Sequence, residues 1–206
     1  MFPMTDRRRS LLLAKATRGK GGVPDDYREL IGLSYGAKAY FLITGFRLRG
    51  SDTVRISFSA NKACNVFGCY TNTTAKDNYS LYASTSSNAK YLRYGGETYN
   101  SYIPPAFVGE RIDAVITPTG TRGMPTDSVI TPETFDGSAD LCVGHTSPSG
   151  TSSKLDGNVW GAFVVDGRLK LIPVERKADG VLGYYDSKSG TFYEPIGSGI
   201  TSLGYA

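Results

Sequence analysis

Val159-Trp160-Gly161-Ala162-Phe163-Val164-Val165 runs into Asp166-Gly167 and continues as Arg168-Leu169-Lys170-Leu171-Ile172-Pro173-Val174. Two apolar stretches separated by Asp-Gly predict a β-hairpin with a type I′ turn. Such a turn needs positive φ at both central residues, which Asp and Gly tolerate better than other residues do. The chain is therefore expected to form β-sheets that pack around this hairpin.

The length of the turn predicts which strand residues face each other. A two-residue turn pairs Val165 with Arg168, Val164 with Leu169 and Ala162 with Leu171. Because alternate residues of a strand share a face, this register assigns one set of side chains to the core. That set is Trp160, Ala162, Val164, Leu169 and Leu171, with Arg168 and Lys170 on the other face.

A second hairpin follows in the same C-terminal third. Val181–Tyr185 and Thr191–Tyr193 are short apolar and aromatic strands separated by Asp186–Gly190. An Asp that opens such a turn accepts hydrogen bonds from backbone amides, and a Gly that closes it adopts the left-handed conformation. We expect Asp186 and Gly190 to take these two roles.

Two motifs near the ends of the chain resemble a known family. The closing motif contains Ile172-Pro173-Val174, Asp179–Asp186, Gly190–Tyr193 and Gly197-Ser198-Gly199, and the opening motif contains Tyr27–Leu30, Gly36 and Phe41–Gly45. Together they are similar to the LamG-like family of concanavalin A-like domains, common in bacteriophages and gut bacteria. The chain departs from that pattern at Ile43, where the family usually has Asp, and in a longer stretch after Gly36.

The resemblance implies an all-β fold, a two-sheet antiparallel jelly-roll sandwich of the concanavalin A-like type over residues 23–206. Composition independently favours an all-β chain, since 25 Gly and 14 Tyr suit short strands and tight turns. Thr53–Ser59 alternates as a half-buried strand should, with Val54, Ile56 and Phe58 inward. Residues 118–139 are expected to form a loop with at most a short strand at Ser128–Ile130.

The first 22 residues differ in charge from the rest. They hold six basic residues and one acidic residue (6 − 1 = +5), whereas residues 23–206 hold 17 basic and 18 acidic residues (17 − 18 = −1). The segment is predicted to be a short basic N-terminal arm, either a disordered tail or a docking arm for an anionic partner. Its candidate docking residues are Arg7, Arg8 and Arg9.

The arm does not fit a secretion signal, because Leu11–Ala14 is shorter than the apolar core of a signal peptide. No membrane span is expected either. The protein is therefore expected to be made in the cytoplasm. Three cysteines without metal-binding spacing are expected to be reduced and buried: Cys64, Cys69 and Cys142.

Half of the tyrosines lie between Tyr70 and Tyr102, among many Ser, Thr and Asn. Two interpretations stay open, since such a mixture is typical of recognition surfaces but also of ordinary strand packing. Alternation places Tyr79, Leu81, Leu92 and Tyr94 inward and Tyr82 and Tyr91 outward, with Tyr99 lifted onto the same surface by the Gly95-Gly96 turn. The candidate ligand-binding residues are Tyr82, Tyr91 and Tyr99.

No catalytic or metal site is expected. Glycoside hydrolases need two carboxylates on one strand face, and Glu110 and Asp113 are three residues apart, which sends them to opposite faces. The single His, His145, sits in a turn-like sequence and is expected to face solvent. Asp140 and Asp156 flank loops, but no spacing resembles a calcium loop. The sequence therefore predicts no catalytic residue, no metal and no cofactor.

The resemblance to LamG-like domains borne by phages, together with the layout of a basic arm before a sandwich and no secretion signal, implies a non-enzymatic bacteriophage virion component, tail- or capsid-associated, that presents a lectin-like domain for attachment. The alternatives are a carbohydrate-active enzyme or its glycan-binding module, and a purely structural capsid decoration subunit. The expected partners are other virion proteins, bound through the N-terminal arm, and a cell-surface glycan. Homo-oligomerisation and a location in the virion are also expected.

Overall fold

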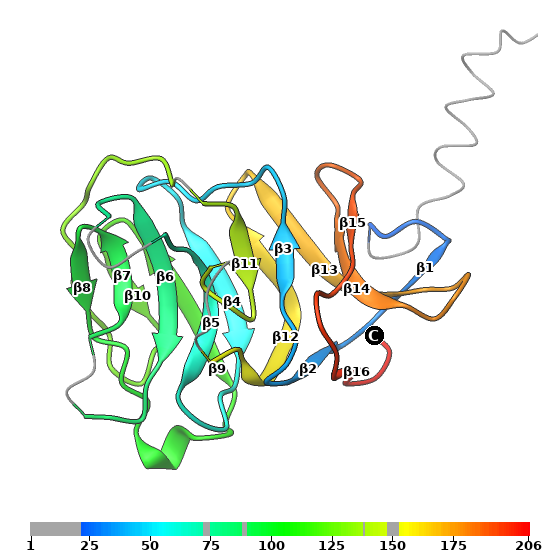
Figure 1. The fold of residues 1–206 in the computed structure, drawn as a ribbon, viewed down its shortest axis with the longest axis horizontal. Coiled ribbons are helices and arrows are strands. Elements are labelled where there is room, and N and C mark those ends of the chain that lie inside the picture. The colour runs from blue at the N-terminus through cyan, green and yellow to red at the C-terminus, as the bar shows by residue number, and fades with distance from the viewer. Residues whose placement is uncertain (1–21, 72–74, 88–89, 138, 148–152) are drawn as a thin grey trace, which may run out of the picture.

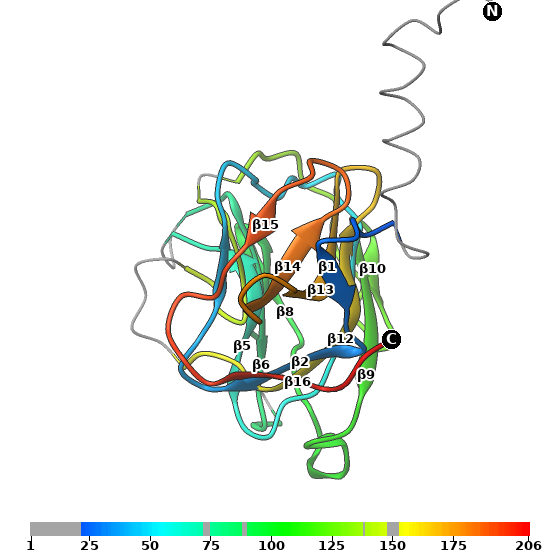
Figure 2. The ribbon, with the colours of Figure 1, turned by 90° about the vertical axis from the view of Figure 1, so that its right-hand side faces the viewer.

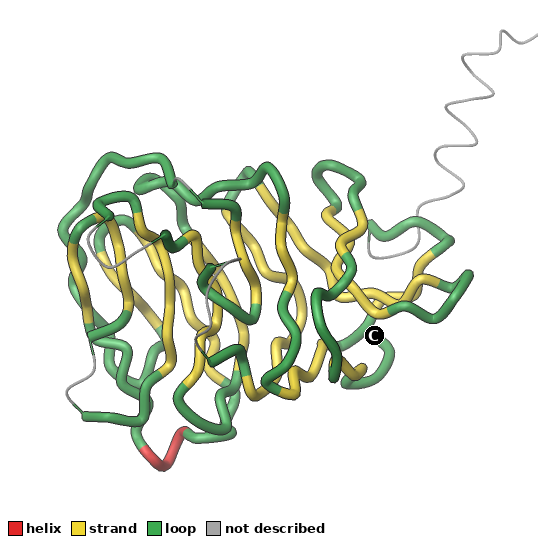
Figure 3. Tube along the Cα trace, viewed as in Figure 1, coloured by secondary structure: helices red, strands yellow, loops and turns green. Residues whose placement is uncertain are grey.

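The computed structural model describes residues 22–71, 75–87, 90–137, 139–147 and 153–206. Arg7, Arg8 and Arg9 lie outside these residues, so their docking role stays a prediction. The described chain is almost entirely strand and loop, and it forms two antiparallel sheets (Figures 1 and 3). The expectation of an all-β protein is confirmed, and the two sheets are packed as a β-sandwich.

The larger sheet contains ten strands and includes both hairpins. Its main path is β10 (Gly120–Arg122), β9 (Ile112–Thr117), β4 (Val54–Phe58), β12 (Asp156–Val165), β13 (Leu169–Arg176), β14 (Leu182–Asp186) and β15 (Phe192–Tyr193). Off this path, β1 (Tyr27–Glu29) pairs with β13, and β2 (Gly32–Gly36) pairs with β12 and with β16 (Ile200–Ser202).

The smaller sheet contains six strands and includes the tyrosine-rich stretch. Its order is β3 (Phe41–Ile43), β11 (Leu141–Val143), β5 (Cys64–Cys69), β6 (Asn78–Ala83), β7 (Leu92–Gly95) and β8 (Glu97–Tyr99). A short 3-10 helix, η1 (Pro105–Phe107), precedes β9. No helix in the described parts of the chain has the length and apolar character needed to span a membrane.

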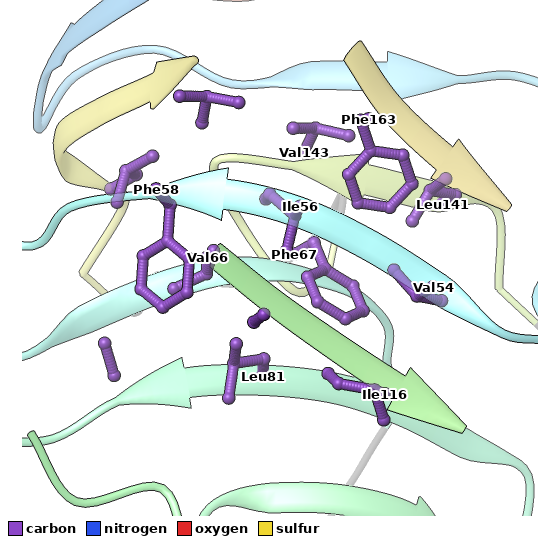
Figure 4. Packing of buried hydrophobic residues seen from close by; sticks show 14 of the residues in the cluster. Val54, Ile56, Phe58, Val66, Phe67, Leu81, Ile116, Leu141, Val143 and Phe163 are labelled. Carbon is purple, nitrogen blue, oxygen red and sulfur yellow. The ribbon is translucent and has the colours of Figure 1, made fainter. Parts of the chain in front are cut away.

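The core lies between the two sheets (Figure 4). Val54, Ile56 and Phe58 on β4 are all buried, as the alternation predicted. They pack with side chains of the smaller sheet, including Phe67 on β5 and Leu81 on β6. The strand alternation of β4 therefore identifies its inner face correctly.

The predicted register of the first hairpin is wrong by one residue. Val165 pairs with Leu169 and Phe163 with Leu171, because the turn contains three residues rather than two. The amide of Arg168 donates to the carbonyl of Val165 at 3.0 Å, and Gly167 takes φ of +74° at the third position of this turn, where a type II turn requires a positive value. A slip of one residue exchanges the two faces of a strand, so β12 contributes Val159, Phe163 and Val165 to the core. Trp160, Ala162 and Val164 are only half-buried, whereas Leu169 and Leu171 are buried as expected.

The reason for this error is that β12 and β13 are apolar on both faces. A second, smaller cluster covers the outer face of β13, with Val23, Ile172 and Val174 buried and Ala162 packed against them. Tyr27 completes the cluster, since its ring centroid lies 5.2 Å from those of Tyr185 and Phe192. Apolar residues therefore do not distinguish the inner face from the outer one here.

The second hairpin forms as predicted. The Asp186 carboxylate accepts hydrogen bonds from the backbone amides of Lys188 (3.0 Å) and Ser189 (3.1 Å), and Gly190 has φ of +79°. Tyr184 pairs with Tyr193 and Tyr185 with Phe192. The loop at residues 118–139 contains one strand that was not expected, β10, which pairs with β9.

Cys64, Cys69 and Cys142 are free and buried, as predicted. Burial raises the pKa of Cys64 to about 11 and those of Cys69 and Cys142 to about 12. The Cys69 sulfur also accepts a hydrogen bond from the backbone amide of Leu48 at 3.3 Å. These thiols are therefore core groups held in their neutral form.

The described chain enters and leaves the sandwich at the same end. Val23 packs against β13, and the backbone amide of Ala206 donates to the carbonyl of Glu29 on β1 at 3.2 Å. Figure 2, viewed from that end, shows β1 beside the C-terminus. In Figure 1, β6 and β7 lie toward the other end of the longest axis.

Candidate ligand-binding pocket on the six-stranded sheet

A pocket lies on the outer face of the smaller sheet. Along β6, Tyr79 and Leu81 are fully buried in the core, so the intervening Ser80 and the following Tyr82 face outward. Along β7, Leu92 and Tyr94 are fully buried, so Arg93 faces outward. The described residues that line the pocket are Asn65, Tyr70, Ser80, Tyr82, Tyr91, Arg93 and Thr146, and its volume is about 200 Å³.

Two tyrosines form one aromatic side of the pocket. The ring centroids of Tyr82 and Tyr91 lie 5.3 Å apart with an interplanar angle of 72°, an edge-to-face arrangement. Tyr91 is 46% exposed, whereas Tyr82 is half-buried. Burial is the main reason why the pKa of the Tyr82 hydroxyl lies above its usual value. The pair presents flat apolar surface together with two hydroxyl groups.

The floor of the pocket is polar. Thr146, from the loop after β11, donates its hydroxyl to the side-chain oxygen of Asn65 on β5 at 3.2 Å. The Asn65 amide group in turn donates to the carbonyl of Ser153 at 2.7 Å. These contacts fix two polar side chains from distant parts of the chain in one place.

Gly68 on β5 allows the floor to pack closely. A Cβ atom at this position would lie 2.4 Å from the Cβ of Ser80 and 3.2 Å from the Cβ of Thr146. Any side chain at Gly68 would therefore push these two residues apart and change the shape of the floor. The glycine is needed for the close approach of its neighbours.

Arg93 and Tyr70 form the other side. The guanidinium carbon of Arg93 lies 5.1 Å from the ring centroid of Tyr70, within the range of a cation–π interaction. The backbone amide of Tyr70 donates to the carbonyl of Thr146 at 2.9 Å, which ties this side to the floor. Among the described residues that line the pocket, Arg93 is the charged one.

The three tyrosines predicted to bind ligand do not all lie in the pocket. Tyr82 and Tyr91 face outward, as predicted, and they meet in the pocket. The prediction that Tyr99 shares their surface is wrong, because Tyr99 pairs with Leu92 across the β7–β8 hairpin and packs against the core. Its hydroxyl accepts a hydrogen bond from the amide of Thr131 at 3.1 Å.

Sequence reasoning missed five of the lining residues, although one signal was available. Arg93 stands between Leu92 and Tyr94, so the alternation that placed those two inward also places Arg93 outward. The same rule applies to Ser80 on β6. Asn65 and Tyr70 reach the pocket through the pairing of β5 with β6, and Thr146 through the pairing of β11 with β5. Local periodicity does not reveal these pairings.

The expectation that His145 faces solvent is wrong. The side chain is 1% exposed, its Nδ1 accepts a hydrogen bond from the amide of Ser147 at 3.1 Å, and its ring lies 5.4 Å from that of Tyr40. The loop after β11 folds back against Tyr70 and Asn65 and so buries the imidazole. His145 is a packed loop residue, outside the set that lines the pocket.

The two loop aspartates bind basic partners. Asp156 contacts the Lys62 ammonium at 2.8 Å and accepts from the Asn61 side-chain amide at 3.0 Å, and these contacts lower the pKa of its carboxyl. Asp140 lies 3.6 Å from the Arg47 guanidinium. Within the described residues no group of three or more His, Cys, Asp or Glu side chains is arranged to hold a metal ion.

Comparisons with protein-family models, curated proteins and solved structures found no match to this chain. The ligand that the pocket could bind is therefore inferred from its lining residues alone. It combines aromatic faces, amide and hydroxyl groups and one guanidinium, with no Asp, Glu or His among the described residues that line it. Such a set of side chains can bind a ligand by stacking and hydrogen bonding.

Proposed function

We propose that the chain is a non-enzymatic component of a bacteriophage virion, tail- or capsid-associated, that presents a lectin-like domain for attachment to a cell-surface glycan. The observation that carries the binding part is the pocket of Tyr82 and Tyr91 above a floor of Asn65, Ser80 and Thr146. Sugars have apolar C–H faces that stack on aromatic rings, and their hydroxyls hydrogen-bond to amide and hydroxyl side chains.

Binding is favoured over hydrolysis by the composition of the same pocket. A glycoside hydrolase needs a carboxylic acid and a carboxylate on either side of the scissile bond. The lining residues that the structure describes supply neither a carboxylic acid nor a carboxylate. The carbohydrate-active enzyme therefore has less support than the binding domain, and a purely structural decoration subunit would not require such a pocket.

The finer fold, a LamG-like jelly roll, belongs to this proposal. The motifs that carry the resemblance are far apart in sequence but adjacent in the sandwich. Tyr27–Glu29 pair with Val174–Arg176, and the amide of Gly36 donates to the carbonyl of Gly199 at 3.1 Å. Ile43, which departs from the family pattern, is buried and pairs with Leu141. The opening and closing motifs thus lie side by side, which supports the proposed LamG-like jelly roll.

We expect Tyr82→Ala and Tyr91→Ala each to weaken glycan binding by about 1–2 kcal/mol, roughly 5–30-fold in Kd. Each change removes one half of the aromatic side while leaving the inner face of β6 and β7 intact. Glycan-array screening followed by titration of the bound glycan measures the effect. The melting temperature of Tyr91→Ala is expected to stay close to that of the unaltered protein, because the side chain is largely exposed.

The matched control is Tyr205→Ala, which removes a tyrosine that is 53% exposed and outside the pocket. It is expected to leave glycan affinity unchanged. If Tyr82→Ala and Tyr91→Ala both unfold the domain and show no selective loss of binding, the two tyrosines are packing residues and the proposal fails.

The virion part of the proposal rests on the basic arm, and it predicts that folding and incorporation are separable. A chain that begins at Val23 is expected to keep its melting temperature and to lose incorporation into particles, as measured by immunoblotting of purified virions. Val23 itself is 4% exposed and packs against Ile172 and Val174. A chain that begins at Asp26 should therefore lose about 1.5–3 kcal/mol of stability. Normal incorporation of the chain that begins at Val23 would contradict the docking role of the arm.

A further inference from the structure

Arg93 differs from most arginines in the described part of the chain, because none of the described acidic residues pairs with it. Nine arginines lie in the described residues, and seven of them form ion pairs with carboxylates: Arg28, Arg47, Arg49, Arg55, Arg111, Arg168 and Arg176. Within the same residues Arg93 forms no such pair. The short internal stretches between the described ranges contain no Asp or Glu in their sequence. The positive charge of Arg93 is therefore not neutralised by the sheet that carries it.

The position of Arg93 leaves its guanidinium able to bind an anion. One face of the group lies over the Tyr70 ring, at 5.1 Å from the ring centroid. Stacking uses the flat face of a guanidinium and leaves the N–H groups at its edge available to an acceptor. Two parallel N–H groups match the two oxygens of a carboxylate, which a lysine ammonium does not do.

The neighbours of Arg93 suit a sugar rather than a simple anion. Ser80 pairs with Arg93 across β6 and β7 and is 3% exposed, and its hydroxyl makes no side-chain hydrogen bond with other described residues. The rings of Tyr82 and Tyr91 lie on the other side of the same pocket. A volume of about 200 Å³ is below the roughly 300–1,000 Å³ of pockets that hold drug-sized ligands. The pocket therefore fits one terminal sugar unit of a longer chain.

We propose that the pocket selects glycans that end in a carboxylated sugar, with Arg93 binding the carboxylate and Tyr82 and Tyr91 contacting the ring. This inference rests on the glycan-binding function proposed above and adds the chemical class of the glycan. The specificity follows from the charge of Arg93, since the other described lining residues carry uncharged polar or aromatic side chains.

The experiment compares two pairs of saccharides, each consisting of an acidic member and its neutral counterpart. In one pair the acidic member carries an additional acidic sugar, and in the other it carries a carboxylate in place of a hydroxymethyl group. Isothermal titration of the full chain with 3′-sialyllactose and lactose, and with cellobiouronic acid and cellobiose, measures the preference. At least one acidic member is expected to bind about tenfold more tightly than its neutral partner, which is the change in Kd expected from one charge-assisted hydrogen bond. Arg93→Gln should bring that ratio close to one without changing the melting temperature, and Arg93→Lys should retain part of it.

Arg122→Gln is the control, since Arg122 is an exposed arginine on the other sheet, also without an ion pair among the described residues. It should leave the preference intact.

Equal affinity for acidic and neutral partners would overturn the acidic specificity while leaving glycan binding in place. An equal loss of the preference in Arg122→Gln would overturn it in favour of a general effect of charge. Tighter binding to a thymidine oligonucleotide than to any acidic sugar would also overturn the acidic-sugar specificity, in favour of nucleic-acid binding, since bases also stack on tyrosines. Failure of the folded chain to bind any glycan would overturn the proposed function together with this inference.

Discussion

Phe163→Ala is expected to lower the free energy of unfolding by about 3–5 kcal/mol, the range for truncation of a buried aromatic side chain. Phe163 is fully buried, and its ring lies 5.4 Å from that of Phe67 at an angle of 71°, so it joins β12 of one sheet to β5 of the other. The surrounding strands are paired on both sides and cannot collapse into the space left behind. Urea denaturation followed by fluorescence or circular dichroism measures the loss.

The adjacent residue is the control. Val164 lies on the opposite face and is half-buried, so Val164→Ala is expected to lower stability by about 1 kcal/mol. The register predicted from a two-residue turn would reverse this order, with Val164 in the core and Phe163 outside. A larger loss for Val164→Ala than for Phe163→Ala would therefore contradict the observed register.

Asp52→Ala is expected to lower the free energy of unfolding by about 3 kcal/mol, the lower end of the range for breaking a buried ion pair. The Asp52 side chain is 4% exposed and contacts the Arg168 guanidinium, which is 28% exposed. Asp52 also accepts from the amide of Arg49 at 2.8 Å and so holds the turn before β4. Arg168 keeps two further contacts, the carbonyl of Arg47 at 3.0 Å and the ring of Phe46 at 4.7 Å, which limit the loss.

Asp136→Ala removes a carboxylate that also pairs with an arginine, Arg49, at 3.0 Å, but its side chain is 80% exposed. Surface ion pairs of this kind contribute less than about 1 kcal/mol. Thermal denaturation of both variants under the same conditions gives the comparison. A loss in Asp52→Ala no greater than that in Asp136→Ala would show that burial of the Asp52–Arg168 pair has no energetic consequence.

Strand alternation and turn residues in the sequence correctly predicted one strand face and one hairpin turn. The alternation of Val54, Ile56 and Phe58 identified the inner face of β4, and the Asp186 and Gly190 turn formed as expected. The first hairpin shows where such patterns stop being informative. Asp-Gly fits a two-residue turn and a three-residue turn equally well, and the choice between them reverses the faces of a strand that is apolar on both.

The candidate site was predicted only where it follows from alternation. Tyr82 and Tyr91 were placed correctly, and Tyr99 was misplaced for a reason that the sequence contains. A two-residue turn at Gly95-Gly96 pairs Leu92 with Tyr99, and cross-strand partners share a face, so an inward Leu92 requires an inward Tyr99. Thr146 was beyond prediction, because it is about 60 residues from Tyr82 in sequence and reaches the pocket through a loop packed on β5.

The position of the chain ends has a consequence for affinity in an assembled particle. Val23 and Ala206 both lie beside β1 and β13, whereas the pocket is on β5, β6 and β7, toward the other end of the longest axis. Copies fixed to a particle by their N-terminal arms would all present their pockets away from the attachment point. Several weak sites held together in this way act at a high effective concentration, and their combined avidity exceeds the affinity of one site by about 10²–10⁴-fold. Under the proposed function, a pocket for a single sugar unit would then be sufficient for firm attachment of the whole particle.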